Sequence, residues 1–121
     1  MELLELYGNT RDEVILLMCA ADVFLMTSVS EGSPQVIKEA MACGCPIVSV
    51  DVGDVKERVE GIMGCFVCPT NNPEAIASLL KEALSFEGKT MGRERILADG
   101  LDNKQVAERL IDVYNIIQNN E

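Results

Sequence analysis

The sequence contains no histidine and few basic residues, 10 Lys and Arg against 20 Asp and Glu. The net charge of −10 at pH 7 argues against nucleic acid, and against an anionic membrane surface, as a partner. No apolar run approaches the ~18 residues of a membrane-spanning helix, so we expect no membrane span. Residues 1–5 lack the basic flank of a signal peptide. These absences predict a protein of the cytoplasm.

Cysteine is present in an odd number, at positions 19, 43, 45, 65 and 68. An odd count without a signal segment predicts reduced thiols. Cys65 and Cys68 have the spacing of half a zinc site, but they fall in a strand-like run, where residues three apart point to opposite faces. Since no histidine could complete a mixed site, we expect small core residues here and no bound metal.

Hydrophobic residues make up 48% of the 121 residues, which is enough for one packed domain over 1–121. Short apolar runs alternate with helical patterns, as in a doubly wound parallel sheet. We predict an α/β fold with about four parallel strands flanked by helices. The predicted strands are 3–7 (with a frayed helix as the alternative), 22–27, 46–50 and 65–68. The predicted helices are 11–20, 34–43, 55–60, 73–85, a stretch between Gly88 and Ala98, and about 103–118.

The segment 31–39 follows the second predicted strand and carries a carboxylate at each end, Glu31 and Glu39. A Gly-Ser-Pro turn and a helix start lie between them, and the first N–H groups of a helix have no partner within it. Helical side chains lean toward the helix N-terminus, so Glu39 would tilt back toward an anion held there. The arrangement suits a ligand with both phosphate and vicinal hydroxyls, as in a nucleotide-sugar. The alternative is an exposed Glu39 paired with Lys38 or Arg58, and a solvated Glu31.

The same segment and its surroundings resemble a known family. The residues that carry the resemblance are Ala21 to Ser28, the two glutamates, and the string Ala40-Met41-Ala42-Cys43-Gly44-Cys45-Pro46-Ile47-Val48. Gly64-Cys65-Phe66-Val67, Pro69 and Pro73-Glu74-Ala75-Ile76 match further downstream. Over about 7–86 the chain resembles the group 1 (family 4) retaining glycosyltransferases, which have the GT-B fold. It is similar to the C-terminal part of their donor-binding domain.

The resemblance assigns roles to individual residues. Glu31 would contact the donor sugar and take part in catalysis, and Glu39 would bind the ribose. Backbone amides of the intervening turn would meet the sugar and the diphosphate, here those of Gly32, Ser33, Gln35 and Val36. The chain departs from the family pattern at Pro34, which has no N–H, and at Thr27, where a proline is frequent.

The resemblance also implies what lies outside this sequence. The basic pair for the diphosphate belongs to the first half of the donor domain, and the acceptor domain is absent, so we expect the 121 residues alone to be inactive. The intact enzyme would transfer a sugar from a nucleotide-sugar to a glycan or lipid-linked acceptor, without a metal cofactor. The alternative is a non-catalytic nucleotide-sugar binding or assembly module. The apolar stripe of the last helix would be uncovered, which favours self-association.

Overall fold

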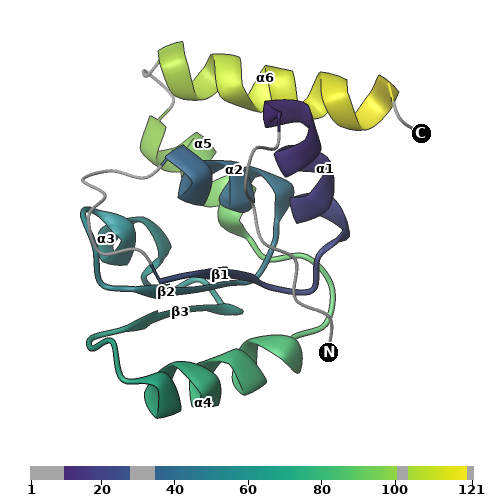
Figure 1. Ribbon diagram of the computed structural model, residues 1–121. Coiled ribbons are helices and arrows are strands. Elements are labelled where there is room, and N and C mark those ends of the chain that lie inside the picture. Colours follow the sequence, from purple (N-terminus) through teal and green to yellow (C-terminus); the bar gives the residue numbers. More distant parts are fainter. Residues whose placement is uncertain (1–9, 28–34, 101–103, 120–121) are drawn as a thin grey trace.

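The computed structural model describes residues 10–27, 35–100 and 104–119. The described residues form three parallel strands and six helices in an alternating α/β order, as the sequence predicted (Figure 1). The predicted strand at 3–7 lies outside the described residues. The elements are α1 (Arg11–Ala20), β1 (Phe24–Met26), α2 (Gln35–Cys43), β2 (Ile47–Val50), α3 (Val55–Val59), β3 (Cys65–Cys68), α4 (Pro73–Leu84), α5 (Gly92–Gly100) and α6 (Lys104–Asn119).

The strands lie in the order β1-β2-β3, and β2 pairs in parallel with both neighbours. Val48 of β2 is opposite Leu25 of β1 and Phe66 of β3. All four residues of β2 are buried, which is the burial expected of a parallel strand covered on both faces. The continuous apolar run that identified this strand in the sequence is therefore explained by its central place.

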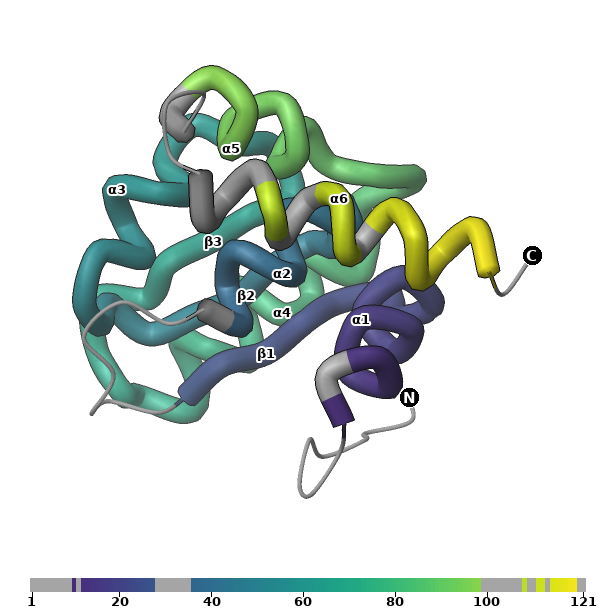
Figure 2. Tube along the Cα trace, turned by 90° about the horizontal axis from the view of Figure 1, so that it is seen from above, coloured from purple at the N-terminus to yellow at the C-terminus, as the bar shows by residue number. Residues whose placement is uncertain are grey.

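Helices cover both faces of the sheet (Figure 1). On one side α4 packs alone against β2 and β3. On the other side α2 lies over β2, and α1, α5 and α6 pack around α2 (Figure 2). Helix α2 is thus the central helix of its layer. No helix in the described parts of the chain has the length and apolarity needed to cross a bilayer.

Local sequence signals set several helix ends. The predicted capping box of α1 is present: the Glu13 amide donates to Thr10 Oγ1 and the Thr10 amide donates to Glu13 Oε1. Asn72 caps α4 by accepting from the amides of Glu74 and Ala75 through Oδ1, with Pro73 at the first helical position.

Helix α2 ends in a Schellman motif at Gly44. The Gly44 amide donates to the Met41 carbonyl and the Cys45 amide to the Ala40 carbonyl, both at 3.0 Å. Gly44 has φ of 70°, a left-handed conformation that glycine adopts without steric cost. The chain then turns directly into β2, so the position of α2 over the sheet is fixed at its carboxyl end.

The predicted turn at Asp99 and Gly100 is wrong. Helix α5 begins at Gly92 and includes both residues. Extending a helix by a residue fixes less chain for each hydrogen bond than nucleating one, so a formed helix can run through weak helix formers at its end. Strand β1 is also shorter than the predicted 22–27, covering Phe24–Met26.

The connection from α4 to α5 closes the amino end of the sheet, at the right of Figure 1. Lys89 Nζ donates to the Cys19 carbonyl at the end of α1, at 2.8 Å. Arg93 Nε donates to the Ala42 carbonyl near the end of α2, also at 2.8 Å. Cations at helix carboxyl termini satisfy free carbonyls and complement the helix dipole. The opposite, carboxyl end of the sheet carries α3 and the loop before it.

Candidate functional site

The candidate site lies where β1 and β2 end and α2 begins, because ligands of open parallel sheets bind at the carboxyl ends of the strands. Of the predicted site residues, Glu31, Gly32 and Ser33 lie outside the described residues. Gln35 is the first residue of α2, and Val36, which follows it, is half-buried. Pro34, the predicted first helical residue, also lies outside the described residues, and the described helix begins one residue later.

Glu39 is buried, with 7% of its surface exposed. Its neighbours along α2, Ala40 and Met41, are fully buried, and α1, α5 and α6 pack around this helix. The alternative of an exposed Glu39 on a solvated helix face is therefore wrong. Among the residues whose side-chain burial is described, it is the one acidic or basic side chain that is buried. Burying a carboxylate is costly unless it has polar partners, and glutamate is seldom buried in folded proteins.

The other buried polar side chains serve local structure. Ser49 Oγ donates to the Val50 carbonyl at 2.8 Å. Thr90 Oγ1 accepts from the Gly92 amide at 3.2 Å, which helps to start α5. Ser49 lies near the carboxyl end of β2, opposite Met26, but its hydroxyl is used by the Val50 carbonyl, so Glu39 is the buried polar side chain that we assign to the site.

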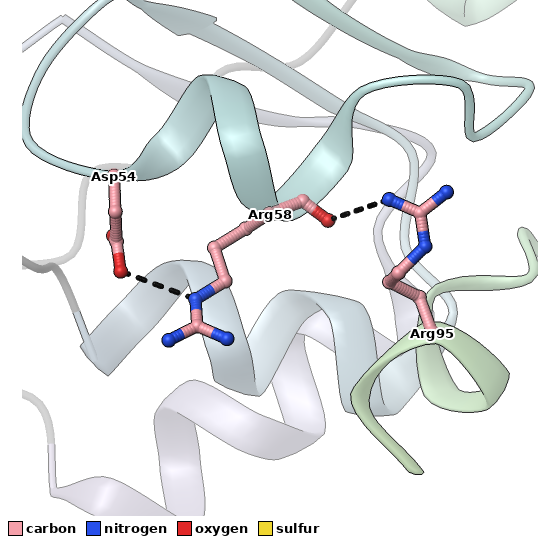
Figure 3. Close-up of polar contacts among 3 residues, drawn as sticks. All are labelled: Asp54, Arg58 and Arg95. Atoms are coloured by element: carbon pink, nitrogen blue, oxygen red, sulfur yellow. Dashed lines mark hydrogen bonds and ion pairs between the residues drawn. The ribbon is translucent and has the colours of Figure 1, made fainter. Parts of the chain in front are cut away.

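A guanidinium also lies on the carboxyl side of the sheet, on α3 (Figure 3). Arg58 Nε donates to Asp54 Oδ2 at 3.1 Å, and the two side chains are 33% and 29% exposed. Arg95 of α5 donates through Nη1 to the Arg58 carbonyl at 3.3 Å, which links α5 to α3. The sequence suggested Arg58 only as one partner for an exposed Glu39. The i, i+4 spacing of Asp54 and Arg58 was the signal for the pair that is observed.

Burial dominates the chemistry of the thiols. It raises the pKa of Cys45 to about 11 and also raises the pKa of Cys65. A metal binds the thiolate, and a raised pKa disfavours that form. Within residues 10–27, 35–100 and 104–119, no group of three or more His, Cys, Asp or Glu side chains is arranged to hold a metal ion.

Comparison with known proteins identifies the relatives of this chain. The family model described as "Glycosyl transferases group 1" matches residues 2–85. The D-inositol 3-phosphate glycosyltransferase of Mycolicibacterium gilvum is 33% identical over 89 residues, which are 73% of this chain and 20% of that protein. The putative glycosyltransferase EpsF of Bacillus subtilis is 32% identical over 116 residues, 92% of this chain and 29% of the relative.

A third relative, N-acetyl-alpha-D-glucosaminyl L-malate synthase of Bacillus anthracis, is 25% identical over 121 residues, 96% of this chain and 32% of that protein. No solved structure matches the chain significantly. The chain spans between about a fifth and a third of the length of these three relatives. With a family match over more than half of its residues, the chain belongs to the group 1 glycosyltransferases.

Proposed function

We propose that this chain is part of the donor-binding domain of a retaining glycosyltransferase with the GT-B fold. The intact enzyme transfers a sugar from a nucleotide-sugar to a glycan or lipid-linked acceptor in the cytoplasm, without a metal cofactor. The chain contributes the ribose-binding carboxylate and the helix N-terminus of the donor site. The predicted apolar stripe of α6 is covered in part, because α6 packs on α1, α2 and α5 and Ile117 packs against the core. Its exposed Tyr114, with the neighbouring Ile111, is proposed as the surface through which the isolated chain self-associates.

The burial of Glu39 is the observation that carries this proposal. A buried carboxylate on the helix that begins at the carboxyl end of β1 can accept two hydrogen bonds from a vicinal diol. The low dielectric around it strengthens such hydrogen bonds. Val36, half-buried one turn earlier, brings a backbone amide of the first turn to the same end of α2. The family match and the names of the relatives support the reaction class.

The remaining roles rest on the resemblance. Glu31 contacts the donor sugar and acts in catalysis, and the amides of Gly32, Ser33, Gln35 and Val36 meet the sugar and diphosphate. The cations that neutralise the diphosphate come from outside this sequence, which agrees with its net charge of −10. We therefore expect the 121 residues alone to bind donor weakly and to transfer no sugar.

The test adds a panel of nucleotide-sugars at millimolar concentration and measures their binding by the change in the NMR chemical shifts of the α2 amides. We expect shifts at Val36 and Glu39, and Kd weaker by at least about tenfold in Glu39→Gln, since hydrogen bonds to a charged group are worth about 1.5–3 kcal/mol. The matched control is Glu57→Gln, an exposed carboxylate of α3, which should leave Kd unchanged.

The outcomes separate the alternatives. If no nucleotide-sugar perturbs α2, or if Glu39→Gln binds as well as the original protein, the donor role of Glu39 is wrong. Sugar transfer by the 121 residues alone would contradict the assignment of part of the site to other segments. Tight binding that depends on Glu39, with no transfer even by the intact protein, would indicate the non-catalytic binding module instead.

A further inference from the structure

Two cysteines lie at the ends of neighbouring helices, Cys19 on α1 and Cys43 on α2, beside the connection between α4 and α5. Cys43 Sγ, near the end of α2, donates to the Ile15 carbonyl of α1 at 3.7 Å. Cys19 lies one turn after Ile15 on α1, and helical side chains lean back over the preceding turn. The Cys19 thiol accordingly lies close enough to Cys43 to act on its pKa. Helix α1 packs directly on α2, so the two cysteines belong to helices that are in contact.

We propose that Cys19 and Cys43 form a redox-sensitive thiol pair, which a peroxide oxidises to a disulfide that joins α1 to α2. Both thiols are free in the structure described here. The pair lies at the amino end of the sheet, away from the candidate donor site.

The two thiols have different environments, which sets the order of the reaction. Cys19 is half-buried and therefore accessible to a small oxidant, whereas Cys43 is 4% exposed. Burial, with the adjacent Cys19, raises the pKa of Cys43 far above its usual range, so Cys43 stays protonated and is a poor first target. The ammonium of Lys89, held on the Cys19 carbonyl at 2.8 Å, supplies positive charge next to the pair.

The reaction balances with one peroxide molecule. The Cys19 sulfur attacks the peroxide, its O–O bond breaks, and Cys19 becomes a sulfenic acid with release of one water. The Cys43 sulfur then attacks the Cys19 sulfur and loses its proton, and the hydroxyl leaves as a second water. Two thiols are oxidised by two electrons in total, and the peroxide is reduced to two waters. A thiol reductant reverses the product to the free pair.

The disulfide would enclose the segment between residues 19 and 43, which contains β1, the predicted donor segment 31–39 and most of α2. Closing this loop restricts the unfolded chain and raises stability. If the proposed function holds, the donor segment lies within a loop whose ends, Cys19 and Cys43, are covalently fixed to one another. The formation of the disulfide itself does not depend on that function, because it is measured without any ligand.

The experiment treats the folded chain with hydrogen peroxide and then blocks the remaining thiols with an alkylating reagent. Trypsin cleaves after Arg11, Lys38 and Lys56, so Cys19 lies in one peptide and Cys43 and Cys45 lie in the next. We expect a cross-link between peptides 12–38 and 39–56, lost on reduction, and a higher Tm for the oxidised protein. Cys19→Ser is the first test variant, because a half-buried position tolerates the change, and it should abolish the cross-link.

Cys43→Ser should also abolish the cross-link, whereas Cys45→Ser is the matched control and should retain it. Cys45 is fully buried two residues away in the same peptide, so it reports whether the partner is specific. A cross-link that survives Cys43→Ser or disappears in Cys45→Ser would overturn the pairing. Oxidation of Cys19 without any cross-link, or no loss of free thiols in folded protein, would overturn the proposal as a whole.

Discussion

Cys45 is the residue whose titration should be visible in the stability of the protein. It follows the α2 cap, is fully buried, and has its pKa raised from 9.0 to about 11 by burial. Between these pH values the folded state retains a proton that the unfolded state has released. The contribution of this thiol to the free energy of unfolding is therefore fully present below pH 9 and is lost as the pH rises to about 11. The expected slope is about 1.4 kcal/mol per pH unit from this thiol.

The measurement is urea unfolding at several pH values in the presence of a reductant. Cys45→Ala removes the titrating group and should reduce the slope above pH 9. A slope in Cys45→Ala equal to that of the original protein would show that other groups cause the loss. The raised pKa of Cys43 adds a contribution of the same sign, so some loss is expected to remain in the variant.

Single residues are also where sequence reasoning reached its limit. The positions of Glu31 and Glu39 marked a candidate ligand segment, but spacing could not decide whether Glu39 is buried. Helix α2 as a whole is covered by α1, α5 and α6, and the last two helices lie far along the chain. Arg58 was similarly visible as a cation, but its pairing with Asp54 depends on the exact start of α3.

At the scale of elements, α4 offers a clean test of a helix cap. Asn72→Ala removes the Oδ1 that accepts from the amides of Glu74 and Ala75. We expect a loss of about 1 kcal/mol in the free energy of unfolding, measured by urea denaturation. Asn71→Ala is the matched control, because it changes the same residue type one position before the cap. An equal effect of the two substitutions would contradict the capping role.

Elements with strong local signals were predicted well. The caps of α1 and α4, the glycine that ends α2 and the strand Cys65–Cys68 were all confirmed. The start of α5 was not, since its first residue is set by Thr90 and by contact with α2 rather than by Gly88. Boundaries that depend on another element cannot be predicted from the segment alone.

At the scale of the whole molecule, Gly92 sets how closely two helices approach. A Cβ on Gly92 would lie 2.7 Å from the Met41 carbonyl oxygen, a backbone atom of α2. Alanine in place of glycine in an open helix stabilises by up to about 1 kcal/mol. Here we expect Gly92→Ala to destabilise by about 1–3 kcal/mol, because α5 must move away from α2. Urea unfolding measures the sign, and a stabilised variant would mean that the two helices adjust freely.

The alternation of strands and helices was sufficient to predict a parallel sheet with helices on both faces. The unequal layers were not predicted: among the described helices, α4 is alone on one face and the other five lie on the opposite side. Which face a crossover helix takes depends on the course of the connections, and the long passage from α4 to α5 changes face without a distinctive sequence motif.

That passage has a consequence for the order in which the protein can be completed during synthesis. Lys89 and Arg93 provide the hydrogen bonds for the carboxyl ends of α1 and α2, yet both follow those helices by about fifty or more residues. On a growing chain the carbonyls of Cys19 and Ala42 lack these side-chain donors until residues 89 and 93 have emerged. A nascent chain arrested before that point would contain all three strand segments but not the residues that cover the amino end of the sheet. We expect chaperones to be needed most at this stage.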